Sequence, residues 1–158
     1  MSTLGKITRR TFLVASVTIA GGVGFGYWKY KQPYGNPLNN DLLEGEATLT
    51  PYVLINQDGV SIIVPRAEMG QGVHTTLAAL VAEELDIELK RINVIHGPAS
   101  GAYFNAAVLE EALPFAFTDT SRLANNARDF VHVPAKLLGL QITGGSSSVA
   151  DAYHKMRV

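Results

Sequence analysis

The sequence predicts an α+β fold in which a β-hairpin is followed by a loop, a helix and a further strand, all preceded by a signal or anchor helix. Three observations support this prediction. Two β-rich runs, 52–56 and 60–64, flank an Asp-Gly turn. Apolar residues then recur at helical spacing over 77–85, and residues 91–96 alternate between apolar and polar side chains.

Composition limits the classes of function that the chain can have. With 158 residues it is about the size of one domain, and its formal net charge of -1 gives no basic surplus for nucleic acid. The absence of cysteine excludes disulfides, thiolate-bound iron–sulfur clusters and a thiolate nucleophile. The four histidines lack zinc-ligand spacing, so we expect no metal site built from side chains.

Residues 1–31 have the pattern of an export signal or an N-terminal anchor. Arg9 and Arg10 precede a weakly hydrophobic run, and residues 1–40 contain no carboxylate. The segment Thr8-Arg9-Arg10-Thr11-Phe12-Leu13 resembles the twin-arginine signals that carry folded, cofactor-loaded proteins across the bacterial inner membrane, which implies a periplasmic location. A Sec signal or a simple anchor helix is the alternative. Aromatic residues and lysines at 27–31 suit a membrane interface, which gives the hypothesis that the segment stays uncut as an inner-membrane anchor; whether it is cleaved stays open.

Residues 32–47 have linker composition, and the folded part is expected to span 48–158. The hairpin turns at Gln57-Asp58-Gly59. In the following helix Leu77, Val81 and Leu85 share the apolar face, while the pair Glu83-Glu84 lies on the solvated face.

The later part of the chain gives weaker signals. Residues 97–109 are irregular. The segment Asp119-Thr120-Ser121 is expected to cap a helix that ends before Pro134 and has Leu123, Ala127, Phe130 and Val131 as apolar positions. Ser146, Ser147 or Ser148 is expected to cap a closing helix. The residues expected to share its apolar face are Val149, Ala152, Tyr153 and Met156. No stop signature follows it, so we expect the chain to be the front part of a longer polypeptide.

Two glycine-containing loops each precede an expected helix. Gly70-Gln71-Gly72 follows the hairpin, and the segment 143–149 contains Gly144-Gly145 and three serines. Glycines allow a ligand to approach closely, and the first N–H groups of a helix have no internal partners, so such loops can present donors to phosphate, oxo or sulfur acceptors. Glycine followed by a serine cap is also ordinary at a helix start, and spacing alone leaves that alternative open.

The first loop and its helix carry a resemblance to a known family. Glu68-Met69-Gly70-Gln71-Gly72-Val73-His74-Thr75, continuing to Val81-Ala82-Glu83-Glu84-Leu85, resembles the molybdopterin-binding subunit of the xanthine dehydrogenase and aldehyde oxidase family, in its isoquinoline 1-oxidoreductase beta-subunit type. The segment 143–149 resembles the second cofactor-contacting loop of that family. The fold would then be part of a larger molybdopterin-binding domain.

The resemblance implies a molybdenum–molybdopterin cofactor in its cytosine dinucleotide form, with the [2Fe–2S] clusters in a partner subunit. The implied partners are the iron–sulfur small subunit, a cytochrome c and the rest of the large subunit. The residues implied to contact the cofactor are Met69, Gly70, Gln71, Gly72, Gly145, Ser146 and Ser148.

One element of the family pattern is missing. The catalytic glutamate of the family lies in a late Gly-x-Gly-Glu context, which this sequence lacks. We therefore expect a cofactor-binding piece of a periplasmic molybdenum hydroxylase, acting on an aldehyde or a nitrogen heterocycle, without a catalytic base. A small exported binding or assembly module without redox activity, and a truncated product without function, stay open. The sequence does not identify the substrate.

Overall fold

The computed structural model describes residues 3–157 and divides the chain into two compact units, one ending at Pro33 and one beginning at Tyr34. The first unit is the single helix α1 (Thr3–Lys31). Within the described residues, its portion Arg9–Lys31 is the one stretch long and apolar enough to cross a membrane, a test that a signal sequence also passes. Its role as signal or anchor stays a prediction.

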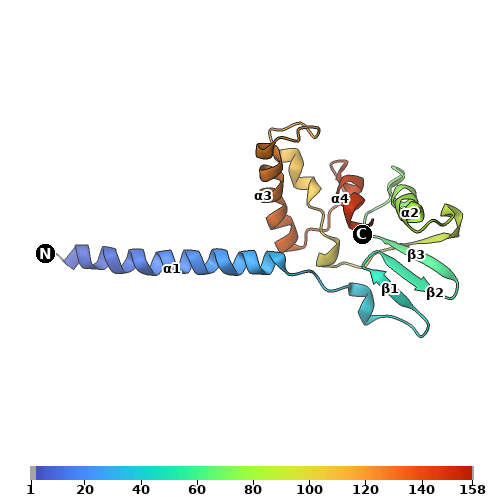
Figure 1. Cartoon of the computed structure of the whole chain (residues 1–158), viewed down its shortest axis with the longest axis horizontal. Helices are drawn as coiled ribbons and strands as arrows, with labels where there is room; N and C mark the ends of the chain where they lie inside the picture. The colour runs from blue at the N-terminus through green and yellow to red at the C-terminus, as the bar shows by residue number, and fades with distance from the viewer. Residues whose placement is uncertain (1–2, 158) are drawn as a thin grey trace. The chain divides into compact units, whose positions relative to one another are not determined.

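The second unit contains a four-stranded mixed sheet with the strand order β1-β2-β3-β4 (Figure 1). The strands are β1 (Ala47–Thr50), β2 (Val53–Asn56), β3 (Gly59–Val64) and β4 (Ile92–His96). The first two pairings are antiparallel, and β3 pairs with β4 in parallel. Together with the helices described below, this sheet confirms the predicted α+β class.

The predicted hairpin is formed by β2 and β3. Asn56 pairs with Gly59, which leaves Gln57 and Asp58 as a two-residue turn. The Asn56 side chain accepts a hydrogen bond from the Asp58 N–H at 3.0 Å. Gly59 has a φ of 134°, a backbone conformation that favours glycine, so the Asp-Gly signal located the turn correctly.

Helix α2 (Val73–Glu84) connects β3 to the parallel strand β4 and covers the sheet. Ile62 on β3 and Leu77 on α2 are completely buried, as the helical spacing predicted for Leu77. Burial of such a side chain contributes roughly 1.5–3 kcal/mol. The pair Glu83-Glu84 is exposed, as expected.

Part of the segment predicted as a linker packs on the second unit. It contains a short 3₁₀ helix, η1 (Pro37–Asn40). The Tyr34 hydroxyl donates to the Lys136 carbonyl at 2.5 Å, and Leu38 packs against the hydrophobic core. The domain boundaries at 32–47 and 48–158 stay predictions.

Helix α3 (Arg122–Leu138) begins as predicted but ends later. The Ser121 hydroxyl accepts a hydrogen bond from the Ala124 N–H at 3.3 Å and caps the helix. The prediction that the helix ends before Pro134 is wrong: the helix continues through this exposed proline to Gly139, whose φ of 60° gives a left-handed C-cap.

The buried face of α3 also differs from the prediction. Ala124 and Ala135 are fully buried, whereas Leu123 and Phe130 are 68% and 78% exposed. The small residues face the core because they allow the helix to approach it closely, and the large apolar residues lie on the outside.

Three short 3₁₀ helices connect the remaining elements: η2 (Leu89–Arg91), η3 (Gly101–Tyr103) and η4 (Ala107–Ala112). Two of them fall in the region that the sequence left irregular. Tyr103, one of the aromatic residues of this region, is completely buried, and its hydroxyl donates to the Pro51 carbonyl at 2.8 Å.

Helix α4 (Ser147–Lys155) closes the unit and contacts α2. Its Ala152 and Met156 are buried as predicted, but Tyr153 is 39% exposed, at the edge of the apolar face, and stacks under the Arg157 guanidinium. Its serines do not cap it through a side chain; instead the Ser147 hydroxyl donates to the Gly144 carbonyl at 2.6 Å.

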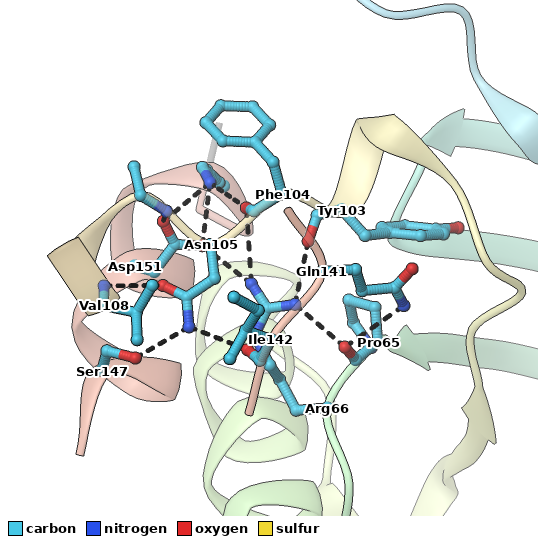
Figure 2. A network of polar contacts seen from close by, with 12 residues as sticks. Pro65, Arg66, Tyr103, Phe104, Asn105, Val108, Gln141, Ile142, Ser147 and Asp151 are labelled. Carbon is cyan, nitrogen blue, oxygen red and sulfur yellow. Dashed lines mark hydrogen bonds and ion pairs between the residues drawn. The ribbon is translucent and has the colours of Figure 1, made fainter. Parts of the chain in front are cut away.

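A buried ion pair joins α4 to the end of the hairpin (Figure 2). The guanidinium of Arg66 donates to the Asp151 carboxylate at 2.9 Å, and both side chains are 2% exposed. The same guanidinium donates to the carbonyls of Pro65 and Tyr103, each at 2.9 Å. Asp151 also accepts from the Lys155 ammonium at 2.8 Å. This network fixes the start of the first glycine loop against the helix that follows the second.

We predict that Asp151→Ala lowers the free energy of unfolding by about 3–5 kcal/mol, because the buried Arg66 guanidinium would lose its counter-charge. Denaturant unfolding of the full chain in detergent micelles, followed by the near-ultraviolet signal of the tyrosines, measures this. The matched control is Glu88→Ala, which removes an exposed ion pair with Lys90 and should cost about 0–1 kcal/mol. Equal losses in the two variants would contradict the prediction.

Candidate functional site

The first glycine loop connects β3 to α2. Gly70 and Gly72 have φ values of 92° and 76°, so the loop needs glycine at both positions. The Glu68 carboxylate accepts three backbone hydrogen bonds, from the N–H groups of Gly70 at 2.8 Å, Gly72 at 3.0 Å and His74 at 3.0 Å. These bonds fold the loop around its own carboxylate.

These hydrogen bonds correct the expectation that the loop presents free N–H donors to a ligand. The N–H groups of Gly70, Gly72 and His74 are directed to Glu68 instead. The bonds from His74 and Gly72, with a smaller one from Gly70, lower the pKa of the Glu68 carboxyl below its ordinary value, because they favour the charged form. The sequence did not indicate this role of the carboxylate, because its three bonds depend on the path of the loop backbone.

The side chain of Gln71 is held in the loop by two hydrogen bonds. Its Oε1 accepts from the Met69 N–H at 2.5 Å, and its Nε2 donates to the Ala67 carbonyl at 2.7 Å. An amide group has two donor hydrogens and two acceptor lone pairs, so one donor and one acceptor remain for a ligand.

The second loop precedes α4 and is bonded directly to the first. The Ala67 N–H donates to the Thr143 hydroxyl at 2.9 Å. Asn105 donates to the Ile142 carbonyl at 3.0 Å and to the Ser147 hydroxyl at 2.7 Å, so it holds both ends of the second loop (Figure 2). The structure thus brings together two segments that lie more than seventy residues apart in the sequence.

A pocket of about 400 Å³ lies between the two loops. Five of the predicted cofactor-contacting residues line it, namely Met69, Gln71, Gly145, Ser146 and Ser148. The other lining residues are Val73, Thr76, Thr143, Gly144 and Val149. The predicted Gly70 and Gly72 belong to the same loop but are absent from the lining. Because every lining residue is uncharged, the pocket suits a ligand surface that exchanges hydrogen bonds without charge.

Five lining residues were not among the predicted cofactor contacts, although three of them, Thr143, Gly144 and Val149, belong to the predicted second loop. Thr76 lies one turn into α2, on the same side as the loop, and its hydroxyl donates to the Gly72 carbonyl at 2.9 Å. Thr143 opens the second motif, and the structure assigns its hydroxyl to the bond with Ala67.

The acidic residues near the second loop do not line the pocket. Glu110 is half-buried and pairs with His132 at 2.6 Å and with Arg128 at 3.3 Å. Glu111 is exposed and lies against Gly145, where an added Cβ would come within 2.6 Å of its carboxylate. Glycine is favoured at position 145 by its φ of 57° rather than by this approach, because the exposed Glu111 side chain can move away from an added Cβ.

Comparison with known proteins now assigns the chain to a class. The family model of the molybdopterin cofactor-binding domain matches residues 9–106, and the chain belongs to this family. The matched range includes the first glycine loop but not the second, so the pocket geometry is the reason to connect segment 143–149 with the same site.

A particular relative is the isoquinoline 1-oxidoreductase subunit beta of Brevundimonas diminuta, which is 37% identical to this chain over 98 residues. The aligned part covers 60% of this chain and 12% of that protein, so the chain spans a small part of the relative's length. No solved structure matches the chain significantly.

We predict that the Glu68 carboxyl titrates below its ordinary pKa of 4.5. The pKa of Glu68 is lower in the folded chain than in the unfolded chain. The three hydrogen bonds therefore stabilise the loop fully at a pH above the ordinary pKa, and this stabilisation is lost as the pH falls through the lowered pKa. Side-chain carbon shifts of Glu68, followed by NMR from neutral pH to acid, measure the midpoint. A midpoint at or above 4.5 would show that the carboxylate does not hold the loop in solution.

Proposed function

We propose that this chain forms one wall of a molybdopterin site, as part of the cofactor-binding subunit of a molybdenum hydroxylase. The observation that supports this most is the uncharged pocket between the two loops, where Gln71 and Ser148 come from opposite sides. Membership in the molybdopterin cofactor-binding family gives independent support.

The residues present fit a pterin. A pterin ring has amide-like and amino groups that need neutral donors and acceptors, and the free donor and acceptor of Gln71 supply one set. The hydroxyls of Ser146 and Ser148 supply another, and Gly144 allows the ring to approach the backbone closely. The volume of about 400 Å³ is sufficient for a part of a large cofactor, in agreement with a single wall of a larger site.

In this proposal the cofactor, when bound, supplies the redox-active metal centre, and the residues of this chain bind and orient its organic part. The whole assembly would oxidise an aldehyde or hydroxylate a nitrogen heterocycle and pass electrons to an iron–sulfur small subunit and a cytochrome c. The cofactor would carry the cytosine dinucleotide extension. The name of the Brevundimonas relative supports an oxidoreductase of this kind. The general base would come from outside the pocket wall described here, because none of its lining residues is acidic or basic.

We also propose that the chain is exported through its twin arginine and stays at the periplasmic face of the inner membrane. The apolar portion Arg9–Lys31 is 23 residues long, against the roughly 20 that a spanning helix needs. Lys29 and Lys31 lie in its last turn, where their charges favour the C-terminal end of the helix.

The cofactor proposal predicts that a simple pterin binds the pocket of the full chain in detergent micelles. NMR shift changes on titration with pterin should be concentrated at Gln71 and at residues 144–149. Gln71→Ala should weaken the binding by about fivefold to tenfold, because it removes one neutral hydrogen-bonding group.

The matched control is Gln57→Ala, in the exposed hairpin turn, which should bind pterin as the wild type does. Shift changes that are absent, or that lie away from both loops, would reject the proposed site. Equal weakening by the two glutamine substitutions would show that Gln71 has no specific role.

The export proposal predicts that replacing both Arg9 and Arg10 by lysine keeps the chain out of the periplasm of a bacterial host. The charge of the segment is unchanged, so a loss of export reports recognition of the arginine pair. Periplasmic and membrane fractions are compared by immunoblot. If the double substitution is exported like the wild type, the twin-arginine route is rejected; if carbonate washing releases the wild type from membranes, anchoring is rejected.

A further inference from the structure

The Glu68 carboxylate occupies the position in which a bound anion would lie at the start of α2. It accepts from three N–H groups of the loop and of the first turn, at 2.8 to 3.0 Å. Helix starts attract anions because their first N–H groups are unpaired and the helix dipole is positive there. In this chain those groups already have an anionic partner from the chain itself.

The bonds made by Glu68 determine how the loop faces the pocket. Gly70 and Gly72 lie on either side of Gln71, and both point their N–H groups toward the same carboxylate oxygen. Gln71 is thereby placed in the lining of the pocket, while Glu68 is outside the lining. The carboxylate therefore acts on a ligand only through the loop that it shapes.

A role for Glu68 as a proton acceptor does not agree with these contacts. A carboxylate that accepts three N–H bonds is stabilised in its charged form and is a weak base. The His74 ring contacts the Arg66 carbonyl at 3.0 Å and lies 6.3 Å from the His96 ring, measured between centroids. These contacts of His74 do not connect Glu68 to the pocket through hydrogen bonds.

We propose that Glu68 is a positioning residue. Its carboxylate accepts the hydrogen bonds of the N–H groups of the first loop, in the place of a bound anion. The first loop then excludes phosphate and contacts a ligand only through uncharged groups, chiefly those of Gln71. This inference rests on the proposed function in one respect, namely that the pocket is the cofactor site. The Glu68 carboxylate then determines which part of the cofactor contacts the first loop. That part is the neutral pterin, and the phosphate groups are bound elsewhere.

The test uses the full chain, labelled with ¹⁵N, in detergent micelles, with inorganic phosphate as the probe. The backbone N–H signals of Gly70, Gly72 and His74 are followed for phosphate-induced shifts and for hydrogen exchange. The wild type is expected to show no phosphate response at these three positions. In Glu68→Gln the one remaining oxygen is an uncharged acceptor and the amide nitrogen cannot accept. Exchange should therefore be faster by about tenfold or more, and phosphate should shift the three signals.

Two further variants separate charge from shape. Glu83→Gln makes the same substitution at an exposed position near the end of α2 and should behave as the wild type does. Glu68→Asp keeps the negative charge and should exclude phosphate, even where its shorter side chain allows faster exchange. Unchanged exchange at Ile62 and Val64 shows that the sheet is intact in each variant.

The inference is overturned if phosphate shifts the three wild-type signals as much as those of Glu68→Gln, or if that variant leaves their exchange unchanged. If Glu68→Gln does not fold, the wild type and Glu68→Asp decide: a phosphate response in both rejects the internal anion, and no response in either supports it. Pterin binding is measured separately, so its absence would reject the proposed function without changing the phosphate result.

Discussion

The buried ion pair between Arg66 and Asp151 is the interaction on which the candidate site depends. Arg66 directly follows the hairpin and precedes the first glycine loop, and Asp151 lies on the helix that follows the second loop. Since burying two charges is unfavourable without close partners, the pair is stable only where the surrounding carbonyls and N–H groups are also in place. Asp151 also accepts a hydrogen bond from the Ala106 N–H at 2.8 Å. This bond connects the irregular region 97–109 to the same network. The two loops are thereby fixed relative to one another before any ligand binds.

This arrangement separates the residues that hold the site from the residues that face a ligand. Glu68 and Asn105 are bonded to backbone or to other side chains of the loops, and neither lines the pocket. Gln71 combines the two roles, since its amide is bonded within the loop and still has a free donor and acceptor. A pocket wall fixed in this way requires little reordering on binding, which lowers the entropic cost of taking up a cofactor.

The sequence was sufficient for the elements whose signals are local. The hairpin, α2 and the first loop follow from an Asp-Gly turn, a 3.6-residue period and two glycines, all of which act over a few residues. The end of α3 could not be predicted, because tertiary packing and the left-handed Gly139 outweigh the unfavourable Pro134. The Arg66–Asp151 pair could not be predicted either, since nothing local marks a contact across 85 residues. For the site, the pattern located both loops but missed Glu68, whose bonds depend on the path of the backbone.

The central claim is that the two loops form a single binding site. Intermolecular nuclear Overhauser effects between the ring proton of a bound pterin and the full chain test it most directly, because they report only atoms in contact. We predict nuclear Overhauser effects from the same pterin ring proton to the side chains of both Gln71 and Ser148. Effects to one loop alone, or to residues outside both loops, would contradict a shared site and leave the two glycine loops as ordinary helix starts.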